Sequence, residues 1–552
     1  MVSSLTKFIF LFCTLLLGLN TNLQAATKDA TIVVRNVTLP DADATDLTVN
    51  IVLINGILDL VTEDTIELDS VDQLFDAANG VIIGQLDVGR PAGFLILRED
   101  PRDNVEALLD TKTYSSFVVY KGKIVKNNYA RVMAKTEQEK KKEKQGWLAY
   151  TPPPLARSSS YADKSKWNRF DSKVVNAIFA GAIVLDRTVF LAQNTDSKYQ
   201  VGDLDGLSGG EIRALRFGTV GTLNFKKPWV YTLFGATHAF DKGFDQRESD
   251  DFSLFDVRLD IPIFDVASFS IGKQKEPISM ERTMSMIDLP MQERSMSSDG
   301  LLPSRNTGVV IAGNLFSNRV SLAGGVFNDF LDKGQPNSPS DNSTQAVGRL
   351  TWVPFKSENE STLLHLGMGL RQSNIREGVS IKTTPEINLA PTFIDSGFID
   401  PMYLDESNNI NLEASLRSGP FWVHAEYNRV NLHAPALLDP EITGYHVTLS
   451  WIATGEVRDY NAKNGTFRSV PISRSVEQNG WGAWEYSVRY STLDANDGLL
   501  LGGDADVWSF GINWWLTDLM NININYRYID LVKDGLDGTN SGITSRIVLV
   551  LE

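Results

Sequence analysis

The stretch NININYRYI, residues 521–529, decides the fold, because it alternates between two kinds of side chain. Asn521, Asn523, Asn525 and Arg527 occupy every second position, and isoleucine or tyrosine fills the positions between them. A period of two places successive side chains on opposite faces of a β-strand. One face of this strand is therefore apolar and aromatic, and the other is polar enough to line water.

The same alternation recurs from about residue 165 to the C-terminus, in WEYSVRYS (484–491), DVWSFGINWW (506–515), TLLHLGMGLR (362–371), NINLEASLR (409–417) and GYHVTLSW (444–451). Strands cross a bilayer only as closed barrels, because every backbone polar group must then be paired internally. Large aromatics on the apolar face and a polar second face favour a membrane barrel over a soluble β protein. About 390 residues at roughly 24 per strand and connection predict an all-β fold with about 16 antiparallel transmembrane strands.

The first 26 residues predict a signal peptide. Lys7 is its positive charge, FIFLFCTLLLG (8–18) its apolar core and LQAA (23–26) its cleavage site. Cys13 is the only cysteine and lies inside this segment, so the mature protein is expected to contain no disulfide. Together with the barrel, the signal peptide predicts a bacterial outer-membrane location.

Residues 27–130 predict a small β-sandwich before the barrel, and we expect it to lie in the periplasm. TIVVRNVTL (31–39), GFLILRED (93–100) and SFVVYKGKIVKN (116–127) are β-type runs, and turn pairs such as Asn55-Gly56 separate such runs. Residues 131–164 predict a linker, with the charge run EQEKKKEK followed by TPPPLARSSS. The barrel then occupies residues 165–552.

The charge balance excludes nucleic acid as a partner. The chain carries a net charge of −16, whereas nucleic-acid-binding proteins present basic surfaces. Residues 161–552 hold 35 Lys and Arg against 48 Asp and Glu, so the barrel region is itself acidic. No His-x-His, HExxH or P-loop spacing occurs, and the five histidines show no metal-ligand spacing. We therefore expect no enzyme activity, no metal and no cofactor.

The charged stretch FSIGKQKEPISMER (269–282) interrupts this pattern of strands. MQERSMSSDGLLPSRNTGVVIAGNL (291–315), VSLAGGVFND (320–329), AVGRLTW (346–352) and EIRALRFGTVGTL (211–223) carry related motifs in a suitable order. Together they resemble the phosphate-selective porin O/P family over about residues 165–552. The chain departs from the family at Ile278, where an aromatic is usual, and at the terminal Glu552.

The resemblance implies a 16-stranded outer-membrane barrel, commonly trimeric, with loops folded into the pore and basic residues along an anion path. A barrel in the outer membrane is expected to contact its lipid, and the paired carboxylates of the loops are expected to hold divalent ions against lipopolysaccharide or to stay hydrated. The N-terminal runs resemble the composite β-sandwich of amidohydrolases without its catalytic barrel, so no hydrolase activity is implied, and the partner of residues 27–130 is unknown. The strand that runs up to Gly272 is expected to end there. The chain would then enter a charged loop at the constriction.

Arginine suits phosphate, because its planar fork donates two parallel hydrogen bonds. Each basic residue has two interpretations: it lines the anion path, or it pairs with a carboxylate such as Glu413 or Glu485 and selects nothing. For Arg282 and Arg294, which each follow a glutamate, the paired interpretation is slightly favoured. The methionines at 280, 284, 286, 291 and 296 are expected to pack the loop against the wall. The candidates for the anion path are Arg213, Arg216, Lys273, Lys275, Arg282, Arg294, Arg305, Arg349, Arg371, Arg417, Arg489 and Arg527, to which Arg546 is added by its alternation.

The predicted function is that of a water-filled porin for small anions, phosphate or polyphosphate. Two alternatives stay open. One is a general or cation-tolerant porin, which the acidic balance favours. The other is a plugged barrel that anchors an envelope-binding domain.

Overall fold

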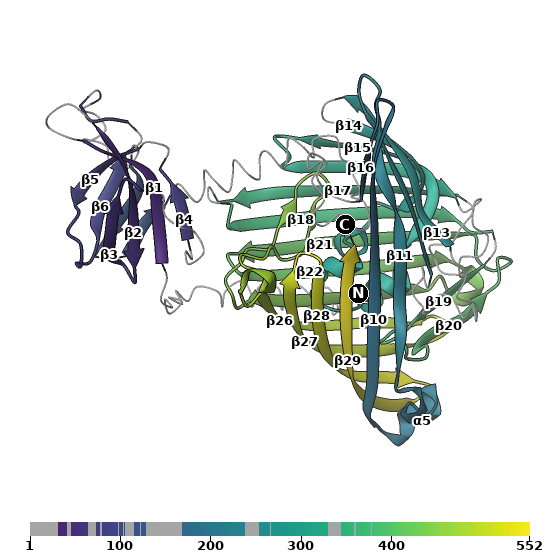
Figure 1. Ribbon diagram of the computed structural model, residues 1–552. Coiled ribbons are helices and arrows are strands. Elements are labelled where there is room, and N and C mark those ends of the chain that lie inside the picture. The colour runs from purple at the N-terminus through teal and green to yellow at the C-terminus, as the bar shows by residue number, and fades with distance from the viewer. Residues whose placement is uncertain are drawn as a thin grey trace. The chain divides into compact units, whose positions relative to one another are not determined.

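The computed structural model describes residues 31–40, 46–64, 73–77, 80–97, 99–102, 104, 115–121, 123–127, 168–237, 253–264, 267–328, 344–357, 360–376 and 378–551. The predicted signal peptide and linker lie outside these ranges. The chain divides into two compact units, residues 18–146 and residues 147–552 with 1–17. Each is described by itself (Figure 1).

The N-terminal unit is one connected eight-stranded sheet in the order β3-β2-β1-β5-β6-β7-β8, with β4 paired to β1. Asn55 and Gly56, between β2 and β3, have φ of 54° and 77°, as the predicted hairpin turn requires. The strands are β1 (Thr31–Leu39), β2 (Leu47–Ile54), β3 (Ile57–Thr62), β4 (Gln73–Asp76), β5 (Val81–Gln85), β6 (Gly93–Leu97), β7 (Ser115–Tyr120) and β8 (Lys123–Asn127).

This sheet folds over a single apolar core. Phe75 on β4 and Phe117 on β7 pack with ring centroids 5.2 Å apart, although these strands are not hydrogen-bonded neighbours. Ile51 on β2 and Ile96 on β6 belong to the same buried cluster. A contact of this kind requires β4 and β7 to face each other across the core. The division into two packed sheets that a sandwich implies stays a prediction.

The second unit is a closed barrel of sixteen antiparallel strands, in which β29 pairs with β10 to close the ring (Figure 1). A short strand, β9 (Arg169–Asp171), adds to β10. The barrel strands are β10 (Val175–Gln193), β11 (Gly209–Leu223), β12 (Trp229–Thr237), β13 (Ser253–Phe264), β14 (Ala267–Lys275), β15 (Arg305–Leu315), β16 (Val320–Asn328), β17 (Thr344–Lys356), β18 (Thr362–Asn374), β21 (Glu406–Ser418), β22 (Phe421–His433), β23 (Glu441–Ile452), β26 (Ala483–Asp497), β27 (Leu500–Thr517), β28 (Met520–Lys533) and β29 (Leu536–Leu551).

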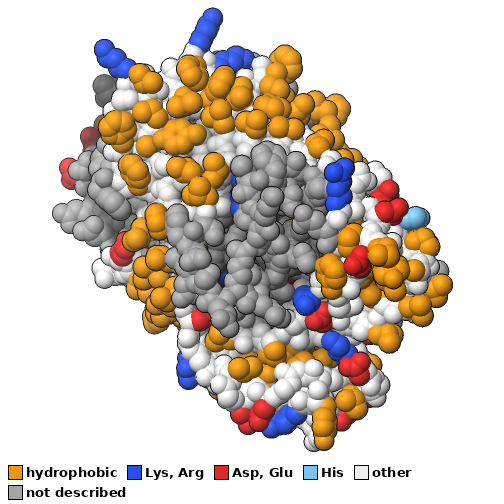
Figure 2. Space-filling view, turned by 90° about the vertical axis from the view of Figure 1, so that its right-hand side faces the viewer, with side chains coloured by type: hydrophobic (Ala, Val, Ile, Leu, Met, Phe, Trp, Pro, Cys, Tyr) orange, Lys and Arg blue, Asp and Glu red, His pale blue; other side chains and the backbone are white. Residues whose placement is uncertain are grey.

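The predicted faces of the strands are confirmed. On β28, Asn525 and Arg527 are fully buried inside the barrel, whereas Ile524 and Tyr528 are 49% and 39% exposed on its outside. Apolar side chains cover much of the outer surface visible in Figure 2. Trp484 and Trp514 stack on that outer side with centroids 5.2 Å apart. An apolar exterior with aromatic girdles is the surface that lipid requires.

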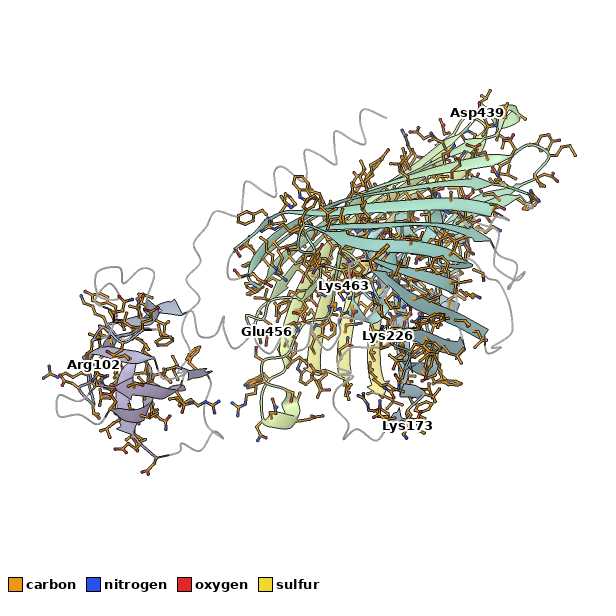
Figure 3. The ribbon with its side chains drawn as sticks, turned by 90° about the horizontal axis from the view of Figure 1, so that it is seen from above. Arg102, Lys173, Lys226, Asp439, Glu456 and Lys463 are labelled. Atoms are coloured by element: carbon orange, nitrogen blue, oxygen red, sulfur yellow. The ribbon has the colours of Figure 1, made fainter. Side chains whose placement is uncertain are left out.

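Three long connections fold into the barrel. We call the rim where β10 begins and β29 ends the proximal rim, and the opposite one the distal rim. The inward segment (276–304) and the distal segment (375–405) enter from the distal rim, and the proximal segment (453–482) enters from the other. Figure 3 labels Asp439 at the distal rim and Glu456 and Lys463 in the proximal segment.

Short elements punctuate these and other connections. Within the described ranges, none of the helices is long and apolar enough to cross a membrane. The helices are α5 (Thr195–Val201), α6 (Met280–Thr283), α7 (Met296–Leu301), and the 3₁₀ turns η2 (Asp205–Leu207), η3 (Met286–Asp288), η4 (Pro435–Leu437) and η5 (Val476–Gln478). The short strands pair as β19 (Val379–Thr383) with β20 (Ile394–Ile399), and β24 (Tyr460–Asn461) with β25 (Thr466–Phe467).

The strand expected to end at Gly272 continues to Lys275, so that prediction was wrong. Gly272 has a φ of 125°, and a Cβ there would lie 2.9 Å from the Cα of Arg258 on the neighbouring strand. Only glycine tolerates this combination. The glycine therefore marks an irregularity within β14 and not its end.

Candidate functional site

The inward segment fills the middle of the barrel, and none of its residues is exposed. Its apolar side chains pack on three separate parts of the wall. Met286 and Ile287 join a cluster on β10–β12 and β29, Ile278 joins one on β15–β17, and Met280 and Met284 join one that includes Trp422. The predicted packing of the methionines against the wall is found at these positions.

All of the basic residues singled out from the sequence are buried inside the barrel, none more than 9% exposed. They differ in what they contact. One group is paired with carboxylates, and a second group contacts neutral groups in the described part of the chain. Carboxylates of the inward segment, as well as those of the wall, decide to which group a residue belongs.

One carboxylate of the inward segment, Glu293, binds two wall arginines. Arg213 on β11 donates from Nε to its Oε1 at 3.0 Å, and Arg546 on β29 also donates to it. Arg546 pairs at the same time with Asp186 on β10, Nη2 to Oδ2 at 2.6 Å. Both arginines are neutralised where β10, β11 and β29 meet.

A second carboxylate group surrounds Arg489 on β26. Its Nη1 donates to Oε1 of Glu281 on the inward segment at 3.2 Å, and its other nitrogens donate to Glu386 on the distal segment. Ser491 also donates to Glu386. This arginine therefore ties two inserted segments to the wall.

On the opposite wall, Arg349 on β17 makes a bidentate pair with Glu413 on β21, at 2.6 and 2.8 Å. His365 Nε2 lies 3.1 Å from the same carboxylate. Arg349 also donates to the backbone oxygens of Asn464 and Gly465 in the proximal segment. The Glu413 pairing anticipated from the sequence is thus found, and it anchors a segment from the proximal rim.

A cationic cluster without such compensation lies where β14 leads into the inward segment. Lys275 Nζ donates to the backbone oxygen of Met284 at 2.7 Å, and Arg294 Nη2 donates to the same oxygen at 3.0 Å. The other partners of these two side chains are the backbone oxygens of Thr283 and Glu281. Two positive charges therefore share one neutral acceptor, at the place where each would gain most from an anion.

Further cations surround this pair. Arg282 and Arg305 lie close enough to repel the ammonium of Lys275, although Arg282 is held by Asp299 at 2.5 Å and Arg305 by Asp256 at 3.0 Å. Asp256 offsets part of the repulsion at Lys275. The cluster is cationic in balance.

The remaining candidates lie elsewhere on the wall. Arg371 pairs with Glu276 at 2.9 Å, so it is neutralised. Arg527 contacts Thr544 Oγ1 and Asn525 Oδ1, and Arg417 contacts two backbone oxygens. Arg216 donates to the sulfur of Met286, and Lys273 is buried on β14.

Two arginines escaped the sequence reasoning. Arg258 lies on β13 inside the barrel, and the alternation of DVRLD (256–260) carries the signal that would have found it. Arg458 belongs to the proximal segment, pairs with Glu485 and covers the ring of Trp422 at 4.9 Å. No alternation marks its stretch. Over the described barrel residues, fifteen buried Lys and Arg side chains face eleven buried carboxylates, so positive charge is in excess among the buried side chains although the chain is acidic.

Nothing in the described ranges gathers three or more His, Cys, Asp or Glu side chains in a geometry that would hold a metal ion. One spacing found around the serine nucleophile of hydrolases, Gly-x-Ser-x-Gly, is present in GLSGG (206–210). There the Ser208 hydroxyl accepts a hydrogen bond from the backbone N–H of Phe190 at 3.1 Å, as a strand-end contact does.

Comparison with known proteins identifies the family of the chain and two of its relatives. Residues 192–545 match the family described as phosphate-selective porin O and P. An uncharacterised protein of Caulobacter vibrioides is 26% identical over 219 residues, which cover 38% of this chain and 43% of that protein. Porin O of Pseudomonas aeruginosa is 32% identical over 154 residues, covering 25% of this chain and 34% of that protein. The matched stretches thus span less than half of either relative.

Among solved structures, an anion-selective porin from Comamonas acidovorans aligns with a TM-score of 0.44 and 10% identity, over 68% of this chain and all of that one. The family match covers more than half of the chain and coincides with the sixteen-stranded barrel. The chain therefore belongs to the phosphate-selective porin O and P family.

Proposed function

We propose that this porin is a diffusion channel for small anions, with phosphate or polyphosphate as its substrates. The observation that carries the proposal is the pair Lys275 and Arg294, whose charges share the backbone oxygen of Met284. An anion entering there would take up charge-assisted hydrogen bonds that the protein itself leaves to a neutral carbonyl. Rings of basic side chains serve anion pores in this way.

The paired arginines have a different role in this proposal. Arg213, Arg349 and Arg489 hold the inserted segments and shape the channel, because their charges are already met by buried carboxylates. Removing one partner of such a pair would leave a buried charge, which is strongly unfavourable. The anion path is therefore assigned to the cluster around Lys275 and Arg294, and Arg216 and Lys273 stay candidates for it. Arg282 and Arg305, which are paired with Asp299 and Asp256, would shape the path.

The test is the reversal potential of the purified protein in planar bilayers under a potassium chloride gradient, repeated with phosphate. We expect anion selectivity, and a fall in chloride current when phosphate is added. In K275Q/R294Q, the anion-to-cation permeability ratio should fall by roughly fivefold per charge removed, which is about 1 kcal/mol at about 8 Å and an effective dielectric constant of about 40.

Two matched variants accompany this one. K275R/R294K keeps both charges and should keep the selectivity. K173Q/K226Q removes two exposed lysines at the proximal rim, which Figure 3 labels, and should change the ratio little because solvent screens them. A cation-selective wild type would overturn the proposal in favour of a general, cation-tolerant porin.

A second candidate is a plugged barrel that anchors the N-terminal unit. Its support is the filling of the interior by three segments, of which the inward segment contacts walls on several sides. Absence of any current from protein that is folded in the bilayer would favour this candidate.

We also propose that the N-terminal unit is periplasmic and that the porin forms a homotrimer in contact with lipopolysaccharide. Protease applied to intact cells should spare residues 27–130 if the unit is periplasmic, and cleave them after the outer membrane is permeabilised. Cross-linking in native membranes should give a species of three chains. Cleavage in intact cells, or a monomer only, would contradict the respective part.

A further inference from the structure

Two buried histidines lie side by side inside the barrel wall. His424 on β22 and His446 on β23 have ring centroids 5.1 Å apart and are 2% and 0% exposed. Within the described residues, none of their four ring nitrogens has a hydrogen-bond partner. A neutral imidazole has one donor and one acceptor, and leaving both unmet in a buried position is unfavourable.

Glu426, two residues along β22, fixes the start of the inward segment. Its carboxylate accepts hydrogen bonds from Ser279 Oγ at 2.6 Å and from the backbone N–H of Glu281 at 2.7 Å. Asn411 Nδ2 donates to it at 2.9 Å. All three donors are neutral, although the carboxylate is fully buried.

The group that could compensate Glu426 is His424. Its Nε2 lies 3.2 Å from Glu426 Oε1, within ion-pair range but off the direction of a hydrogen bond. Glu413 on β21 is directly opposite Glu426 in the sheet, so a second buried carboxylate faces the first. Arg349 holds Glu413. A positive charge on His424 would therefore compensate Glu426, which no arginine of the described ranges contacts.

His446 has a similar relation to the inward segment. Its Nδ1 lies 3.8 Å from Glu281 Oε2. Arg489 also pairs with Glu281, so this carboxylate is partly compensated without the histidine. The charged and titratable groups facing the two imidazoles are Glu281 on the inward segment, Glu426 on β22, Glu413 on β21 with its contact His365 on β18, Arg489 on β26, and Arg458 of the proximal segment across Trp422.

We propose that His424, His446 and Glu426 form a proton-binding latch that ties the inward segment to β22 and β23. Glu426 is the positioning residue, and the proton is the ligand. With neutral imidazoles, the segment is held at this point by hydrogen bonds to an uncompensated carboxylate. With a protonated His424, a small ring rotation completes an ion pair with Glu426 and satisfies the orphaned nitrogen.

The sign of the effect follows from the charges. A proton taken up by an imidazole adds positive charge beside Glu426 and Glu281, so the segment is held more firmly in the protonated state. The proposal does not depend on which ion the channel prefers, because it concerns how firmly the segment is seated.

The first test is the rate of spontaneous current flicker of the purified full chain in planar bilayers, at pH 8.0 and pH 5.5. We expect the wild type to flicker about tenfold less at pH 5.5, a change that corresponds to about 1.4 kcal/mol. H424Q and E426Q should remove this pH dependence. H433Q is the matched control, because His433 is exposed and pairs with Asp405, and it should behave as the wild type.

A second readout covers a channel that carries no current. Thr283 lies on the inward segment, is 3% exposed and has a hydroxyl without a hydrogen-bond partner. In a Cys13→Ser background, T283C should react with a methanethiosulfonate reagent more slowly when the latch is protonated. Comparison with T283C/H424Q at each pH cancels the titration of the thiol. Equal rates with and without His424 at both pH values, or flicker in H424Q that still depends on pH as in the wild type, would overturn the proposal.

Discussion

Gly369 on β18 lies directly against the inward segment. A Cβ built on it would lie 2.8 Å from the carbonyl carbon of Ile278 and closer still to the carbonyl oxygen. Ile278 is fully buried in a cluster with Leu302 and Phe327, so it has little room to retreat. An added methyl group would therefore move the segment by about 1 Å or more, at a cost of roughly 1–3 kcal/mol for overpacking.

We accordingly expect G369A to lower the free energy of unfolding in lipid vesicles by roughly 1–3 kcal/mol. Because Ile278 is three residues beyond Lys275, single-channel conductance should change as well. The control is G348A on the neighbouring strand, where the nearest atom to the new Cβ is 3.8 Å away. If G369A matches G348A in stability and conductance, the wall does not position the segment by this contact.

Three other perturbations test separate features. R349A should lower the free energy of unfolding by about 3–5 kcal/mol, because Glu413 would be left buried with its charge. The control K356A breaks a partly exposed pair with Glu360 and should cost less than about 1 kcal/mol. Equal losses in chemical unfolding would contradict the buried-pair argument. Burial raises the pKa of Glu281, but His446 and Arg489 outweigh it, and the pKa is lowered. The stabilisation contributed by ionised Glu281 is present above the pH range in which glutamate ordinarily titrates, and it is lost as the pH falls through the lowered pKa. The free energy of unfolding of E281Q should therefore fall less steeply between pH 6 and pH 3 than that of the wild type. Deletion of residues 27–146 should leave a barrel that inserts and conducts, because the two units are separately compact; loss of heat-resistant migration in the shortened chain would refute that independence.

The wall of the barrel follows from the sequence because each strand carries its own evidence. Alternation placed Asn525 and Arg527 inside and Tyr528 outside, and a one-residue slip would have reversed every side chain. The number of strands followed from chain length and the usual size of a strand with its turn. Local pattern was sufficient for both predictions.

The interior could not be predicted in the same way. Arg546 meets Asp186 across 360 residues of chain, and Arg213 meets Glu293 across 80. No local signal tells which arginine finds a carboxylate and which finds a carbonyl. Arg458 was missed because the proximal segment shows no alternation. Its regular structure is limited to the two-residue strands β24 and β25 and the turn η5.

The pair formed by Arg546 and Asp186 spans the junction between the last strand and the first. That junction forms only when synthesis and insertion have delivered the whole sheet, so a partly assembled barrel lacks the site that Glu293 joins. The inward segment therefore gains this anchor after the wall has closed around it. In biogenesis, this anchor of the inward segment would be the last to form, whereas its contacts with β22 and β26 do not depend on the junction.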